Sequence, residues 1–127
     1  MIDWDKLITE AKRSRSNAYA RFSNFKVGAA LLGADGRIIT GCNVENSSYG
    51  LTMCAERTAL FKAVSEGIRE YLAIAVYSET SPPTRPCGAC RQVLYEFNPL
   101  MEIACANADG KIDKFTLSEL LPEGFKL

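Results

Sequence analysis

The hydrophobic residues of this chain recur with two different periods, and the two periods alternate along the sequence. Helical spacing, with apolar residues three or four positions apart, begins after Asp3 and returns in residues 52–66, 90–97 and 117–121. Runs of strand length lie in residues 26–33, 37–44, 71–77, 101–107 and 111–116. Asp-Gly pairs at 35–36 and 109–110 separate two pairs of these runs, and Asp-Gly is typical of tight antiparallel hairpins.

The predicted order of elements is helix, strand, strand, helix, strand, helix, strand, strand and a short final helix. A helix between the third and fourth strands favours a parallel pair with a right-handed crossover. We therefore expect an α/β fold, a three-layer α-β-α sandwich with a five-stranded mixed sheet, formed as a single domain by residues 1–127. The second and third helices both follow strands, so we expect their N-termini to meet at one edge of the sheet, where α/β folds bind ligands.

The charge balance narrows the choice of partners. Fifteen Lys and Arg residues match fifteen Asp and Glu residues, and no segment concentrates basic residues. A protein that grips a nucleic-acid backbone usually presents a basic face, so this balance argues against a nucleic-acid partner and favours a small uncharged ligand. No apolar run approaches the roughly 20 residues that a membrane helix needs, and the first residues lack the apolar core of a signal peptide. We therefore expect a cytoplasmic protein without a membrane partner.

The chain has five cysteines and no histidine. Cys54 stands at the predicted start of the second helix, and Cys87 and Cys90 stand one turn apart at the start of the third. Helix N-termini carry partial positive charge, which favours thiolate over thiol. Three thiolates on Zn²⁺ leave the fourth tetrahedral position open for water, which is the arrangement of a catalytic zinc site.

The residues around these cysteines supply further chemistry. Glu56 follows Cys54 by two positions, so its carboxylate can reach a metal-bound water and collect its proton. Three thiolates make a zinc site net negative, and a guanidinium from Arg57 or Arg91 can withdraw charge by donating hydrogen bonds to sulfur. Gln92 can orient an arginine in turn.

Other interpretations of the same residues remain open at this point. The Cys87–Cys90 pair alone is compatible with a redox dithiol. A structural zinc site needs a fourth protein ligand, for which Cys42 and Cys105 are the remaining thiols, although both lie in predicted strands. Glu56 on its own is also compatible with a solvated helix carboxylate.

The two cysteine motifs resemble the zinc signature of the cytidine deaminases. Residues 54–59 read Cys-Ala-Glu-Arg-Thr-Ala, and residues 86–92 read Pro-Cys-Gly-Ala-Cys-Arg-Gln. The wider deaminase superfamily often has His as the first ligand, so Cys54 makes this chain similar to the small homotetrameric type with an all-cysteine zinc site. The resemblance implies Zn²⁺ as cofactor and a cytidine deaminase-like fold.

The resemblance also implies a reaction. Free cytidine and 2'-deoxycytidine are deaminated to uridine and 2'-deoxyuridine with release of ammonia, a step of pyrimidine salvage. In the family, zinc-bound water attacks C4 of the pyrimidine, and the residue matching Glu56 moves the proton to N3 and then to the leaving amine. The backbone N–H of Ala55, at the start of a helix, can bind the carbonyl of the base.

Residues 22–31 and 41–46 resemble the family's substrate-binding segments. The resemblance implies that Phe25 packs against the nucleoside and that Asn43 and Glu45 hold the ribose hydroxyl. It also implies that Phe125 completes the pocket of a neighbouring subunit in a homotetramer.

Two positions depart from the family pattern. Arg21 stands where the family commonly has Pro, and Arg85 stands where Ser often precedes the zinc-site proline. At position 85 we expect the backbone carbonyl to matter more than the side chain. Three alternatives are a deaminase of an aminonucleoside antibiotic such as blasticidin S, a nucleotide deaminase, and a zinc module without catalysis. The run Arg57-Thr58-Ala59, Gln92 and the Asn43/Glu45 pair favour cytidine over the antibiotic. The lack of a basic cluster argues against a nucleotide, and Glu56 argues against a module without catalysis.

Overall fold

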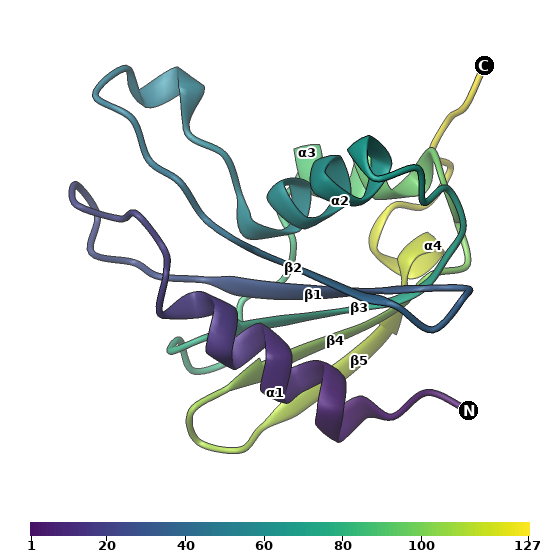
Figure 1. The fold of residues 1–127 in the computed structure, drawn as a ribbon, viewed down its shortest axis with the longest axis horizontal. Coiled ribbons are helices and arrows are strands. Elements are labelled where there is room, and N and C mark those ends of the chain that lie inside the picture. Colours follow the sequence, from purple (N-terminus) through teal and green to yellow (C-terminus); the bar gives the residue numbers. More distant parts are fainter.

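A five-stranded sheet forms the middle layer of the protein (Figure 1). The structure is a computed structural model and describes residues 1–127. Its strands are β1 (Gly28–Gly33), β2 (Ile38–Cys42), β3 (Tyr71–Ser78), β4 (Glu102–Asn107) and β5 (Ile112–Thr116). They lie in the order β2-β1-β3-β4-β5. β3 and β4 are parallel, and all other neighbours are antiparallel, which confirms the predicted mixed sheet.

Helices cover both faces of this sheet. α1 (Trp4–Arg15) lies on one face, and α2 (Ala55–Ser65), α3 (Gly88–Tyr95) and α4 (Leu117–Leu120) lie on the other (Figure 1). A core of 17 buried residues fills the space beneath α2, α3 and α4, and a smaller core of seven buried residues lies beneath α1. The predicted three-layer α/β fold is therefore confirmed. None of the helices combines the length and the apolar character that crossing a bilayer requires.

Two glycines let a helix approach the sheet closely on either face. A Cβ atom on Gly28 would lie 1.9 Å from the carbonyl oxygen of Ala11 in α1, and one on Gly41 would lie 2.4 Å from the backbone nitrogen of Ala59 in α2. Glycine is required wherever two backbones come this near. Gly41 thus fixes how closely α2, with the residues at its N-terminus, sits against the sheet.

The segment between β2 and α2 differs from the prediction. The apolar run was expected to continue as strand to residue 44 and the helix to begin near residue 52, whereas β2 ends at Cys42 and α2 begins at Ala55. Val44 leaves the sheet because its backbone pairs with Tyr19 and Met53. A short 3₁₀ helix, η1 (Tyr49–Leu51), lies in the same segment and has no periodic apolar signal. These pairings bring the chain back to the point where α2 starts.

Candidate active site

The three cysteines of the two motifs converge where α2 and α3 begin. Cys54 is the N-cap residue of α2, Cys87 is the N-cap residue of α3, and Cys90 lies in the first turn of α3. Their three Sγ atoms all lie within 4.8 Å of one another. The Sγ atoms of Cys54 and Cys87 are 3.8 Å apart, and those of Cys87 and Cys90 are 3.5 Å apart. No disulfide joins them, so all three are available as metal ligands.

Neighbouring donors favour the thiolate form of Cys54. Hydrogen bonds from Cys90 and from Arg57 lower the pKa of Cys54 to about 5, against the opposing effect of burial. Nη2 of Arg57 donates to its sulfur over 3.6 Å. The same contact raises the pKa of Arg57, so the guanidinium stays charged. Hydrogen bonding to Cys54 and burial raise the pKa of the Cys90 thiol.

Glu56 lies beside this cluster in the first turn of α2 and is only 5% exposed. Burial raises the pKa of its carboxyl to about 7, and the negative charge of Cys54 acts in the same direction. A carboxyl with a pKa near neutrality can both accept and release a proton in that range. The alternative of a solvated helix carboxylate does not agree with this burial.

The cluster opens into a cavity of about 360 Å³. Cys54, Ala55, Glu56 and Cys87 line one part of it. The other lining residues are Ser23, Phe25, Val27, Asn43, Glu45, Thr52, Met53, Val76, Thr84 and Arg85. The structure therefore places the predicted base-contacting and sugar-contacting residues around one cavity. Thr52, Met53, Val76 and Thr84 also line the cavity and were not predicted, because they belong to none of the recognised motifs.

Two of the predicted sugar-binding side chains also hold the loop that carries Phe25. Oδ1 of Asn43 accepts from the backbone N–H of Val27 (2.9 Å), and its Nδ2 donates to the carbonyl of Phe25 (2.7 Å). Oε1 of Glu45 accepts from the backbone N–H of Ser23 (3.1 Å), whose hydroxyl also bonds the Glu45 carboxylate. These contacts lower the pKa of Glu45 and keep it ionised. The structural role of the two side chains was not predicted.

The two arginines that follow zinc-motif cysteines have different partners. Arg57 faces the sulfur of Cys54, whereas Arg91 donates to the carbonyl oxygens of Pro86 (2.7 Å) and Leu120 (2.8 Å). Of the two candidates for withdrawing charge from sulfur, the structure therefore brings only Arg57 into contact with a thiol.

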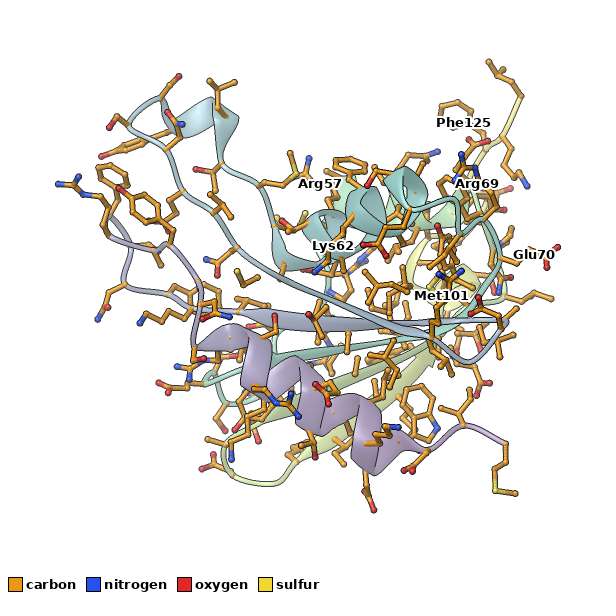
Figure 2. The ribbon with its side chains drawn as sticks, viewed as in Figure 1. Arg57, Lys62, Arg69, Glu70, Met101 and Phe125 are labelled. Atoms are coloured by element: carbon orange, nitrogen blue, oxygen red, sulfur yellow. The ribbon has the colours of Figure 1, made fainter.

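Gln92 and Phe125 do not line the cavity of their own chain. Nε2 of Gln92 donates to the backbone carbonyl of Phe125 over 3.1 Å, not to an arginine. The Phe125 side chain is 65% exposed and does not line the cavity. Figure 2 shows it beside the C-terminal tail, whereas Arg57 lies along α2.

The remaining two cysteines do not join the cluster. Cys105 is buried in β4, where burial raises the pKa of its thiol to about 12, and Cys42 ends β2. The group of residues that can hold a metal contains Cys54, Cys87 and Cys90 and no fourth ligand. A closed four-cysteine site is therefore not formed.

Known proteins are similar to this chain in both sequence and fold. The sequence model of the cytidine and deoxycytidylate deaminase zinc-binding region matches residues 1–106. A cytidine deaminase of Sporosarcina psychrophila is 53% identical over 125 residues, covering 98% of this chain and 92% of the relative. One of Halalkalibacterium halodurans is 54% identical, covering 98% of this chain and 95% of the relative. The crystal structure of cytidine deaminase from Burkholderia pseudomallei superposes with a TM-score of 0.94 at 52% identity, covering 98% of this chain and all of that one. The chain thus belongs to the cytidine and deoxycytidylate deaminase family, in its form with three zinc-binding cysteines.

Proposed function

We propose that this protein catalyses the hydrolytic deamination of free cytidine and 2'-deoxycytidine to uridine and 2'-deoxyuridine, releasing ammonia as a step of pyrimidine salvage. The observation that carries the proposal is a buried carboxyl, Glu56, beside three convergent thiols, two of which line the same cavity as Glu56. A redox dithiol would need neither the third thiol nor the carboxyl.

We assign Cys54, Cys87 and Cys90 as the ligands of Zn²⁺. Three soft sulfur donors at two positively polarised helix ends would suit zinc, and two of them, Cys54 and Cys87, line the cavity. Arg57 reduces the negative charge of the site through its contact with Cys54. The bound metal supplies a Lewis acid that brings the pKa of water from ~15.7 toward ~7.

Glu56 holds and moves the proton in this proposal. Its carboxylate takes a proton from the attacking water and delivers it to N3 of the pyrimidine. It then takes the remaining proton of that water from the hydroxyl now bonded to C4 and delivers it to the amino group, which leaves as ammonia while the C4 carbonyl forms. The pKa of about 7 suits a group that changes its protonation state twice in each cycle.

The other lining residues orient the nucleoside. The free backbone N–H of Ala55, at the start of α2, binds the carbonyl of the base. Phe25 packs against the substrate, and Asn43 and Glu45 hold the ribose hydroxyl while they keep the Phe25 loop in place. Among the residues that line the cavity, only Arg85 is basic, and it is paired with Asp113, so a free nucleoside is favoured over a nucleotide.

We further propose that residues 1–127 are a single domain that assembles as a homotetramer, in which Phe125 completes the cavity of a neighbouring subunit. The support is that Phe125 is exposed and does not line its own cavity, while Tyr49, Leu51 and Phe61 expose further apolar surface. A cytoplasmic location agrees with the free state of all five cysteines, because reducing compartments keep thiols available for metal.

The test follows the ultraviolet absorbance of cytidine on addition of purified protein, with and without prior chelation of the metal. We expect conversion to uridine that is lost on chelation and restored by Zn²⁺. Zinc-replete protein that leaves cytidine and deoxycytidine unchanged would contradict the proposal. Parallel assays with deoxycytidylate and blasticidin S would then show which aminopyrimidine is the substrate.

A further inference from the structure

The segment between β3 and α3 carries Cys87 to the thiol cluster, yet its backbone has little support of its own. From Glu79 to Pro86 no backbone group takes part in a backbone–backbone hydrogen bond. Three of these eight residues are prolines, which have no N–H to donate. Thr84 and Arg85 from this segment line the cavity. Side chains must therefore hold the segment that presents one of the three thiols.

The first half of the segment is held from β4 and from within. Nδ2 of Asn107, the last residue of β4, donates to the carbonyl of Thr80 over 2.9 Å. The hydroxyls of Thr80 and Thr84 lie 2.6 Å apart, within hydrogen-bonding distance. These contacts fix the turn after β3 and leave the two residues before Cys87 to other partners.

Arg85 reaches from the second half of the segment to β5. Its Nη1 donates to the carbonyl of Pro83 (2.9 Å), and its Nη2 lies 3.2 Å from Oδ2 of Asp113. Its guanidinium also lies over the ring of Phe115, 5.1 Å from the centroid. Asp113 and Phe115 are alternate residues of β5 and therefore point to the same side of the strand.

The negative charge of Asp113 requires a cation at the position of the Arg85 guanidinium. Its Oδ2 is buried and has no partner with hydrogen-bond geometry, so the nearby Arg85 guanidinium supplies its compensating charge. A cation held at once by a carboxylate, an aromatic face and a carbonyl has little freedom to move. The contact with Pro83, which is itself fully buried, ties the segment to the same fixed group.

We propose that Arg85 is a positioning residue, whose guanidinium, anchored on Asp113 and Phe115 of β5, fixes the segment that presents Cys87 to the metal and forms one wall of the cavity. Arg91 acts from the other side by holding the carbonyl of Pro86. The side chain of Arg85 thus has a role of its own at a position where the sequence led us to expect that the backbone carbonyl matters more. The inference rests on the proposed zinc enzyme but concerns the residues that surround it.

The test compares zinc release from Arg85→Met with that from the wild type. Release is followed with a chromogenic zinc chelator, alongside kcat and KM for cytidine and the melting temperature. We expect about 10-fold faster release, the scale seen when a group that orients a metal ligand is removed, together with a lower kcat. Asp113→Asn, which keeps the shape of the side chain, should change release in the same direction, and Arg85→Lys should recover part of the loss.

Arg37→Met is the matched control. Arg37 is also paired with an aspartate, Asp35, at 2.7 Å, but it lies in the hairpin between β1 and β2, outside the cavity. Its zinc release and kinetics should equal those of the wild type. Wild-type release from both Arg85→Met and Asp113→Asn, whatever their melting temperatures, would overturn the proposal. If the variants release zinc faster but the wild-type protein does not deaminate cytidine, the positioning role of Arg85 is supported and the proposed reaction is contradicted. The experiment therefore distinguishes a failure of this inference from a failure of the proposed function.

Discussion

The starts of α2 and α3 look alike in sequence and differ in how they are supported. Each begins at a cysteine N-cap whose side chain makes no capping hydrogen bond, and each has an arginine within four residues of that cap. Ala55 and Glu56 at the start of α2 are buried, whereas Cys87 and Gly88 at the start of α3 are exposed. α2 lies directly on the glycine of β2, while α3 follows a segment without backbone–backbone hydrogen bonds.

The difference in burial between the two helix starts corresponds to a difference in what their residues do. The buried start of α2 carries the groups whose charge and proton affinity matter, since burial is what raises the pKa of Glu56 to about 7. The start of α3 supplies two thiols, the exposed Cys87 and the buried Cys90, and its position depends on Arg85 and Arg91. The proton-moving group is thus placed on the buried, closely packed element, and the other element completes the metal site.

The largest effect on activity is expected for Glu56→Gln, which tests the role of the buried start of α2. We expect kcat for cytidine to fall about 10²–10⁴-fold, because the amide cannot carry the proton, while zinc content stays at that of the wild type. Steady-state ultraviolet assays and elemental analysis measure the two quantities. Glu66→Gln at the exposed C-terminal end of the same helix is the control and should have wild-type activity. Near wild-type turnover by the Glu56 variant would show that α2 carries no proton-moving group.

Arg57→Gln and Arg91→Gln sharpen the comparison of the two arginines. Loss of the Arg57 contact with Cys54 should weaken zinc binding or activity about 10–100-fold, because the negative charge of the thiolate is no longer reduced. Arg91→Gln removes contacts with carbonyl oxygens and none with a thiol, so it should lower the free energy of unfolding by about 1 kcal/mol for each lost hydrogen bond. Because one of these carbonyls belongs to Pro86, we also expect weaker zinc binding, but by a smaller factor than in Arg57→Gln. Competition with a zinc chelator and urea unfolding measure these effects. Equal zinc affinities in the two variants would remove the distinction between the arginines.

Gly41→Ala and Gly88→Ala compare the supports of the two helices, with the smallest expected effects. A Cβ on Gly41 would lie 2.4 Å from the backbone of α2, so the helix must shift, and we expect a loss of about 1–3 kcal/mol in the free energy of unfolding. A Cβ on Gly88 meets nothing within 4 Å, so its substitution should change stability by about 0.5 kcal/mol or less. Chemical unfolding of both variants checks this, and equal losses would contradict the tighter support of α2.

Much of the fold could be predicted because each segment carries a local period. The alternation of helical and strand patterns gave the element order, and the helix between β3 and β4 gave their parallel pairing. The excursion around η1 could not be predicted, since Val44 leaves the sheet to pair with Tyr19 and Met53, which are distant in sequence. Such pairings depend on tertiary contacts and produce no periodic pattern of hydrophobic residues in the sequence.

The sequence by itself determined the chemistry of the site, because ligand type is a property of the residue. A chain without histidine but with Cys54, Cys87, Cys90 and Glu56 in these motifs can build a zinc site only from sulfur and carboxylate. Only the tertiary structure decided that Arg57 faces sulfur and Arg91 faces carbonyls, and that Glu56 is buried. It also decided that Arg85 is anchored to a strand 28 residues later. Burial, and charge pairing between distant segments, depend on which surfaces meet, and only the folded chain brings those surfaces together.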